Sequence, residues 1–194
     1  MAEKPDHVFL VDGSGFIFRA YYGLPQMTRP DGTPVNAVFG FSNMLMKLLD
    51  DTDAEYIAVI FDTARQTFRN DIYADYKANR DDPPEDLIPQ FPLIRDAVKA
   101  FGLPAVDKQG FEADDLIATY ARRAAAEGHQ VTVVSSDKDL MQLVDDRITM
   151  MDPMKNTIIG AEQVMEKFGV GPDKVVEVQA LAGDQSDNVP GVPG

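Results

Sequence analysis

The stretch VFLVDG at residues 8–13 joins four apolar residues to an aspartate and a glycine. A short apolar run that stops at a turn signal predicts a buried strand. The same pattern recurs in YIAVIFD at residues 56–62 and in VTVVSSD at residues 131–137, and a shorter strand is expected at residues 148–151. Three of the four predicted strands therefore end at or just before an aspartate.

Segments with helical periodicity lie between the predicted strands. Asn36 can cap a helix whose apolar residues recur three and four positions apart. A second helix is expected at residues 112–127, where Gly128 ends it, and two short helices are expected at residues 161–168 and 172–182. This alternation predicts an α/β fold with a mostly parallel central sheet flanked by helices on both faces.

The residues TFRNDIYADYKANR, 67–80, interrupt this alternation. They are polar and rich in arginine, lysine and tyrosine, and DDPP follows them. We expect an exposed, mobile and partly helical excursion from the sheet here. In a helix, Tyr73, Tyr76/Lys77 and Arg80 would stand three or four positions apart and could line one face. The alternative is a solvated helix whose charges form weak surface pairs.

Composition excludes several classes of protein. The chain of 194 residues can bury one substantial core, and it has no cysteine for disulfides, thiol catalysis or cysteine metal sites. No apolar run approaches the roughly 18 residues of a membrane span. The first residues contain no cleavable apolar signal, which favours a cytoplasmic protein.

The net charge of −14 argues at first against a protein that binds nucleic acid, because such proteins usually carry a basic surface. The argument weakens if many acids share one site. Nine acids gather near the expected carboxyl edge of the sheet, where open α/β folds bind ligands, or in the last loop. These acids are Asp12, Asp62, Glu112, Asp114, Asp115, Asp137, Asp139, Asp184 and Asp187. When these nine acids are left out of the count, 23 of the 32 acidic residues remain, against 18 basic residues.

Converging carboxylates require protonation or a cation. Two of them about 5 Å apart repel by roughly 3 kcal/mol at an effective dielectric constant near 20. Oxygen ligands favour Mg²⁺ or Mn²⁺, and two such ions can activate water and stabilise the leaving oxygen of a phosphodiester. Each acid alone could instead form a turn, cap a helix or stabilise a helix dipole.

Six motifs occur in one order along nearly the whole chain. They are VDGSGFIFRAYYG (11–23), AVIFD (58–62), TFRNDIYADYKANR (67–80), EADDLIATYA (112–121), SSDKDLMQLV (135–144) and LAGDQSDNVPGVPG (181–194). In these motifs the chain resembles the 5′-nuclease domains of bacterial DNA polymerases I, in the flap endonuclease superfamily. EADD, SDKD and the GDxSDNxPGVPG stretch are the most specific of them.

The resemblance implies a PIN-like 5′-nuclease core at residues 1–160, with a helical arch at about 66–100 over the active site. Residues 161–194 would begin a helical DNA-binding subdomain, cut within a helix-hairpin-helix turn. The nine acids would hold two or more Mg²⁺ ions, for which Mn²⁺ can substitute. Asp137, Asp139, Asp184 and Asp187 would serve a second ion, with Asp114 near both.

The same resemblance assigns roles to residues of the arch and the last turn. Lys77 and Arg80 would be catalytic cations that clamp the scissile phosphate. Tyr76 could stack on a base. The remaining candidate contacts to DNA are Arg19 and Arg69 for phosphates, and Gly191 and Gly194 for the duplex backbone.

The implied function is a structure-specific 5′-3′ exonuclease or flap endonuclease that acts in primer removal and repair. Its partners would be DNA with a 5′ flap, a nick or an RNA primer, and a polymerase domain in the same chain. A monomer near the bacterial nucleoid is expected. Alternatives are a stand-alone flap endonuclease, a PIN-type ribonuclease and an inactive module that binds DNA junctions. A phosphatase with Asp12 as nucleophile would need a second aspartate where Ser14 stands.

Overall fold

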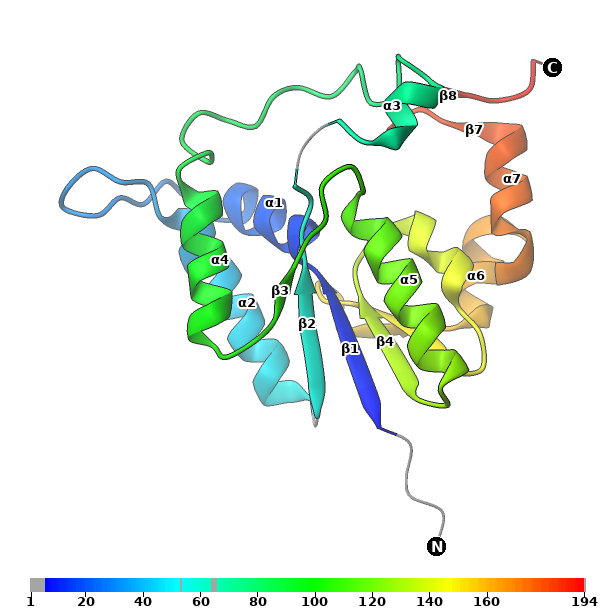
Figure 1. Ribbon diagram of the computed structural model, residues 1–194, viewed down its shortest axis with the longest axis horizontal. Helices are drawn as coiled ribbons and strands as arrows, with labels where there is room; N and C mark the ends of the chain where they lie inside the picture. Colours follow the sequence, from blue (N-terminus) through cyan, green and yellow to red (C-terminus); the bar gives the residue numbers. More distant parts are fainter. Residues whose placement is uncertain (1–5, 53, 64–65, 194) are drawn as a thin grey trace, which may run out of the picture.

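The computed structural model describes residues 6–52, 54–63 and 66–193. Its centre is a six-stranded sheet in the order β3-β2-β1-β4-β5-β6, in which only β6 runs antiparallel to its neighbour (Figure 1). The strands are β1 (His7–Asp12), β2 (Tyr56–Ile60), β3 (Ala105–Val106), β4 (Gln130–Val134), β5 (Ile148–Asp152) and β6 (Thr157–Ile159). The predicted α/β class with a mostly parallel sheet is confirmed.

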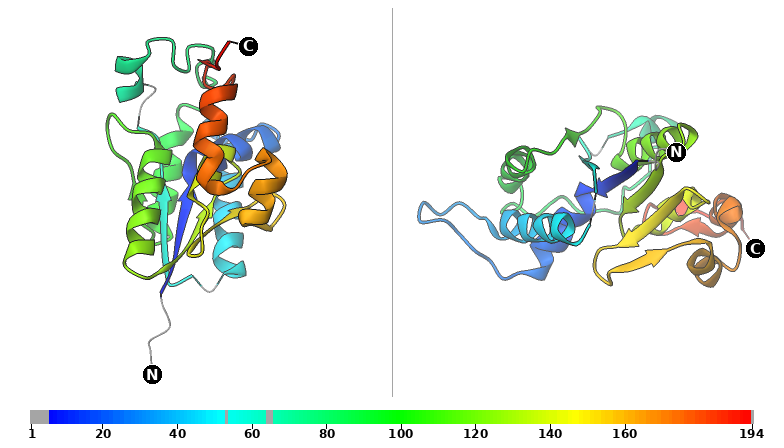
Figure 2. Two further views of the ribbon diagram at one scale, coloured as in Figure 1. Left: turned by 90° about the vertical axis from the view of Figure 1, so that its right-hand side faces the viewer. Right: turned by 90° about the horizontal axis from the view of Figure 1, so that it is seen from below.

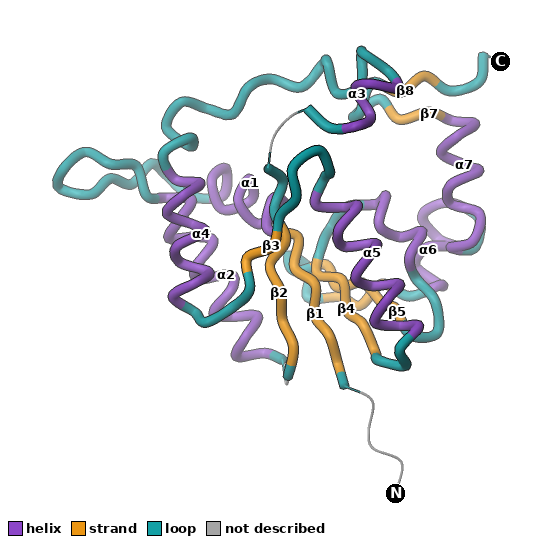
Figure 3. The backbone as a smooth tube through the Cα atoms, in the orientation of Figure 1, coloured by secondary structure: helices purple, strands orange, loops and turns teal. Residues whose placement is uncertain are grey.

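Helices cover both faces of the sheet (Figures 2 and 3). One face packs against α1 (Gly13–Gly23), α2 (Asn36–Asp51) and α4 (Gln90–Ala100). The other face packs against α5 (Ala113–Ala126), the 3-10 helix η1 (Lys138–Leu143) and α6 (Ala161–Phe168). The remaining elements are α3 (Phe68–Ile72), η2 (Pro172–Lys174), α7 (Val175–Ala182), β7 (Gly183–Asp184) and β8 (Val189–Pro190).

The central strand β1 contributes to both cores because its side chains alternate between faces. Phe9 and Val11 are buried with α1 and α2, whereas Leu10 is buried with α5. A strand buried on both faces reads as a continuous apolar run, which is why this stretch predicts the sheet. No helix in the part of the chain that the structure describes is long and apolar enough to cross a membrane.

The expected cap of α2 is wrong. Asn36 is already the first helical residue, and Val35 at the cap position makes no side-chain bond to the helix. The side chain of Gln90, fully buried on α4, accepts hydrogen bonds from Ala37 N at 2.8 Å and Val38 N at 3.2 Å instead. A residue 53 positions away from Ala37 in the sequence therefore replaces the local cap.

The predicted helix across Tyr73–Arg80 is also wrong. Only α3 is helical in this region, and the chain from residue 73 to 80 follows turns, with Lys77 at a left-handed φ of 56°. Its polar groups bond to a distant part of the chain: Lys77 N, for example, donates to Asp187 O at 2.9 Å. The range expected for the helical arch, about 66–100, also contains α4, whose Ile94 and Val98 are fully buried in the core.

Candidate functional site

The carboxyl edge of the sheet places two aspartates at the ends of neighbouring strands, β1 and β2. Asp12 ends β1 and caps α1, because its side chain accepts from Gly15 N at 2.8 Å. Its other oxygen accepts from Ser135 Oγ at 2.8 Å. Asp62 follows β2 and accepts from Ala113 N at 2.7 Å, so its carboxylate lies at the positive end of α5.

Four acids converge at this edge, and we call Asp12, Asp62, Asp114 and Asp137 the edge cluster. Burial raises the pKa of Asp114 well above its usual value, and the charges of the other three acids raise it further. Burial likewise raises the pKa of Asp12, with smaller contributions from Asp62 and Asp137. Both shifts arise because burial removes water from the ionised carboxylates, and at Asp114 the charge of Lys77 offsets only part of the rise.

The donor chemistry of the edge cluster fits a hard divalent cation. It offers only carboxylate oxygens, and a positive ion would remove the repulsion that raises the pKa of Asp114. The acids are near enough to repel one another but are not arranged around one point. Among residues 6–52, 54–63 and 66–193, no three acidic or histidine side chains form a group that could hold a metal ion as they stand.

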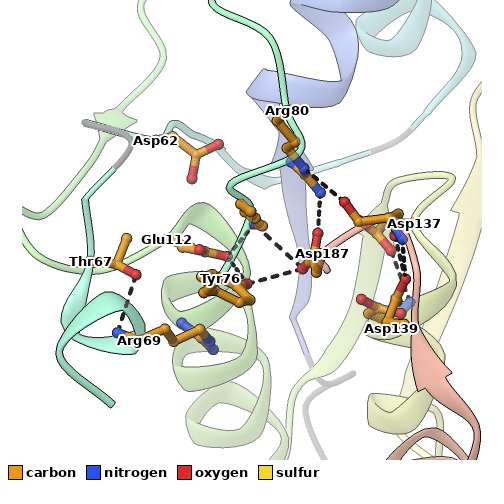
Figure 4. A network of polar contacts seen from close by, with 12 residues as sticks. Asp62, Thr67, Arg69, Tyr76, Arg80, Glu112, Asp137, Asp139 and Asp187 are labelled. Carbon is orange, nitrogen blue, oxygen red and sulfur yellow. Dashed lines mark hydrogen bonds and ion pairs between the residues drawn. The ribbon is translucent and has the colours of Figure 1, made fainter. Parts of the chain in front are cut away.

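Two cations from the segment between α3 and α4 face predicted metal-site acids. Lys77 Nζ lies 2.7 Å from Glu112 Oε2 and 3.7 Å from Asp187 Oδ2, and Arg80 forms an ion pair with Asp187. Figure 4 shows Tyr76 and Glu112 pointing toward Asp187. The Tyr76 hydroxyl lies 3.2 Å from Glu112 Oε2 and 3.0 Å from Asp187 Oδ2, so its one proton can be donated to either carboxylate. Burial and these two carboxylates raise the pKa of Tyr76.

Arg69 pairs with an acid of the protein. Its two terminal nitrogens lie 2.8 and 2.7 Å from the two oxygens of Asp115. Burial acts to raise the pKa of Asp115, but the bonds from Arg69 and from Glu112 N outweigh it and lower the pKa. The guanidinium therefore ties α3 to the first turn of α5, a role that its place in a polar stretch does not reveal.

The remaining acids lie around η1 and β7. Asp137 caps η1 by accepting from Asp139 N at 2.9 Å, while Asp139 accepts from the Gln179 amide of α7. Burial raises the pKa of Asp139, and the charge of Asp137 adds to this. Burial acts to raise the pKa of Asp184, but bonds from Ser186 and Lys138 lower it to about 2.

The other predicted contacts to DNA lie on α1, beside the end of α7, or outside the described residues. Arg19 is exposed on α1. Gly191 packs so closely against the end of α7 that a Cβ atom would lie 2.5 Å from Ala182 O. Gly194 lies outside the described residues.

A cavity of about 400 Å³ lies beside Asp62, between α1, α4 and the segment containing Lys77 and Arg80. Sequence reasoning missed Arg95 on its wall. The Arg95 guanidinium lies 4.7 Å from the centre of the Phe61 ring, donates to Asp62 O at 3.1 Å and pairs with Asp107. Arg95 stands in an amphipathic helix without a motif, so only the fold reveals its contact with the strand end.

Comparison with known proteins gives consistent results. The family described as 5′-3′ exonuclease, N-terminal resolvase-like domain, matches residues 7–169. DNA polymerase I of Rhizobium leguminosarum is 59% identical over 200 residues, which cover 99% of this chain and 20% of that protein. A 5′-3′ exonuclease of Aquifex aeolicus is 40% identical over 187 residues, 96% of this chain and 65% of that protein.

The fold is also found among solved structures. A flap endonuclease of bacteriophage T5, in complex with DNA and metal ions, superposes with a TM-score of 0.79 at 22% identity, over 97% of this chain and 70% of that one. This chain spans only about a fifth of the DNA polymerase I that it matches. The match over residues 7–169 shows that the chain belongs to the 5′-3′ exonuclease family, whose N-terminal resolvase-like domain it contains.

Proposed function

We propose that this chain is a metal-dependent 5′-nuclease that hydrolyses phosphodiester bonds in DNA carrying a 5′ flap or a nick. One observation carries the proposal: Asp62 of the edge cluster and Glu112 line the same cavity as two protein cations, Lys77 and Arg80. Acids that favour a divalent cation, next to cations that favour a phosphate, are the components that phosphodiester hydrolysis requires. Membership of an exonuclease family supports the same reaction.

The proposed cofactor is Mg²⁺, with Mn²⁺ as a substitute. The edge cluster and Glu112 would hold one ion, and Asp139, Asp184 and Asp187 would serve another. Asp115 would contribute through its ion pair with Arg69. Such ions, when bound, activate water and stabilise the leaving oxygen. Several solved relatives of the same fold contain divalent ions, including zinc in a T5 5′-exonuclease.

Lys77 and Arg80 would bind the scissile phosphate by exchanging partners. In the present structure they pair with the carboxylates of Glu112 and Asp187. A phosphodiester carries the same charge sign and offers acceptors of the same kind, so both cations can turn to it once cations occupy the carboxylates. Contacts of this kind read the backbone, and they select DNA by its shape and not by its sequence.

The proposed setting follows from the relatives. The chain would be the N-terminal part of a DNA polymerase I, with the polymerase domain in the same polypeptide, and would remove RNA primers and flaps. We further propose that the protein acts as a monomer in the bacterial cytoplasm, where the chromosome lies.

Cleavage of a 5′-labelled flap DNA tests the proposal. The purified chain, its Asp114→Asn variant and an Asp173→Asn control are incubated with Mg²⁺, with Mn²⁺ or with chelator. Asp173 is an exposed acid of η2, outside the site. We expect cutting at the junction by the chain and the control only when a metal is present, and none by Asp114→Asn. Normal turnover of Asp114→Asn, or cutting of single-stranded RNA in preference to the flap, would contradict the proposal.

A further inference from the structure

Two segments more than 100 residues apart in the sequence lie side by side above the edge cluster. We call residues 73–80 the strap and residues 183–190, which contain β7 and β8, the hairpin. Figures 1 and 2 show both at the same end of the molecule, beyond the carboxyl edge of the sheet. The strap carries Lys77 and Arg80, while the hairpin carries Asp184 and Asp187.

The contacts between strap and hairpin are of two kinds. Those of the first kind use an ionised side chain: Lys77, Arg80 and the Tyr76 hydroxyl contact the Asp187 carboxylate, and Arg80 Nε also donates to Ser186 O at 3.4 Å. These contacts compete directly with a bound cation and with a phosphate, so the proposed reaction must break them.

The neutral contacts join side-chain amides and one backbone N–H to carbonyl oxygens. Asn188 Nδ2 donates to Asp75 O at 2.8 Å, Asn79 Nδ2 donates to Gln185 O at 2.9 Å, and Lys77 N donates to Asp187 O at 2.9 Å. None of them uses an ionised group, so neither a metal nor a phosphate competes for them. They can persist when the charged contacts exchange partners.

Asn188 is the best placed of these residues to hold the strap. It is partly buried, its backbone φ is 59°, and its N–H donates to Gln185 O at 3.3 Å, which closes the hairpin. Asparagine tolerates this left-handed conformation better than most residues, and its short amide can still donate outward. One residue therefore shapes the hairpin through its backbone and reaches the strap through its side chain.

We propose that Asn188 is a positioning residue that couples the hairpin to the strap and so holds Lys77 and Arg80 over the edge cluster. The inference rests on the proposed function for its catalytic consequence, but the coupling itself is a property of the folded chain. DNA that docks at the hairpin would then meet strap cations that are already positioned beside the acids.

A fluorescence measurement tests the coupling without any reaction. The chain contains neither cysteine nor tryptophan, so Ala74→Cys on the exposed strap can carry a bimane dye and Val189→Trp on the hairpin can quench it. We expect strong quenching in this pair and its loss when Asn188→Gly or Asn188→Asp is added. Glycine keeps the left-handed backbone without the amide, and aspartate keeps the shape without the donor. Quenching that survives both changes would overturn the coupling.

Steady-state cleavage of the flap DNA tests the consequence in unlabelled chains. Misplacing a group by about 1 Å can slow a reaction by about 100-fold. We therefore expect Asn188→Gly and Asn188→Asp to lower kcat about 10- to 100-fold, with KM changed by no more than about twofold, because most duplex contacts remain. An unchanged kcat, or a rise in KM alone, would refute the positioning role.

Asn156→Gly is the matched control, because Asn156 also has a left-handed backbone, with φ of 50°, in the exposed turn between β5 and β6. It should leave quenching and cleavage unchanged. Should the unsubstituted chain not cut DNA at all, the proposed function fails, while the quenching still decides whether Asn188 holds the strap.

Discussion

Replacing Asp114 with asparagine should make the metal-free protein more stable. Asp114 is an acid of the edge cluster whose pKa is raised well above its usual value by burial and by Asp137, Asp12 and Asp62. Asparagine has nearly the same size and carries no charge. The substitution therefore removes repulsion and desolvation without leaving a cavity.

The magnitude follows from the pairwise repulsion. Two carboxylates about 5 Å apart repel by roughly 3 kcal/mol at an effective dielectric constant near 20. Uptake of a proton by Asp114 relieves part of this when the pH lies below its folded-state pKa, by about 1.4 kcal/mol for each unit of difference. We expect a net gain of about 1–3 kcal/mol at neutral pH, which corresponds to a rise in Tm of about 2–12 °C for a domain of this size.

Thermal unfolding in the presence of a chelator measures this gain, and its pH dependence gives a second check. The pKa of Asp114 is higher in the folded protein than in the unfolded one, so the wild-type chain loses stability as pH rises through the folded-state pKa. The advantage of Asp114→Asn should thus disappear at low pH and grow as pH rises. A lower Tm of the variant in chelator at neutral pH would refute the reasoning.

Adding Mg²⁺ should reverse the order of stability. A ligand that binds only the folded state at 100 times its Kd stabilises it by about 2.7 kcal/mol. The wild-type chain should gain this stabilisation, and the variant should gain less because it has lost a carboxylate at the site. Asp173→Asn, at an exposed position, should follow the wild-type chain in both conditions.

Three further perturbations test separate parts of the structure. Lys77→Met should lower the single-turnover rate of flap cleavage about 100- to 1,000-fold, because a donor aimed at the developing charge is lost, and equal rates would remove Lys77 from the reaction. Gln90→Leu should lower the free energy of unfolding in urea by about 2–4 kcal/mol, since the buried N–H groups of Ala37 and Val38 lose their acceptor. A smaller loss would mean that water replaces the amide. Gly191→Ala should lower Tm, because its Cβ would lie 2.5 Å from Ala182 O, and an unchanged Tm would show that the hairpin shifts freely.

Much of the fold can be predicted from local patterns. The stretches at residues 8–11, 56–60, 131–134 and 148–151 form strands because an apolar run between turn signals has few other stable conformations. The same regularity brings Asp12, Asp62 and Asp137 to one edge, since parallel strands end together. Strands β3 and β6 escaped prediction because they are only two and three residues long.

The features that escaped prediction depend on long-range partners. Nothing near Asn36 indicates that Gln90 takes over the cap of α2. The spacing of Tyr76, Lys77 and Arg80 suits a helix, yet their contacts with residues 185–188 determine the backbone there. In the sequence Arg69 looks like a cation that is available to bind DNA, whereas in the fold it forms an ion pair with Asp115. In each case the deciding partner lies more than 40 residues away.

The position of Asp187 in the chain has a consequence for protein synthesis. The edge cluster begins at Asp12, but the partner of the strap cations emerges from the ribosome 175 residues later. Until the hairpin has been made, the strap can contact Glu112 but lacks Asp187 and the carbonyl groups of the hairpin, and a nascent chain would have an incompletely assembled centre. A nuclease built in this way would remain harmless to nearby nucleic acid while it is being translated, and the order of its residues would delay its activity without any inhibitor.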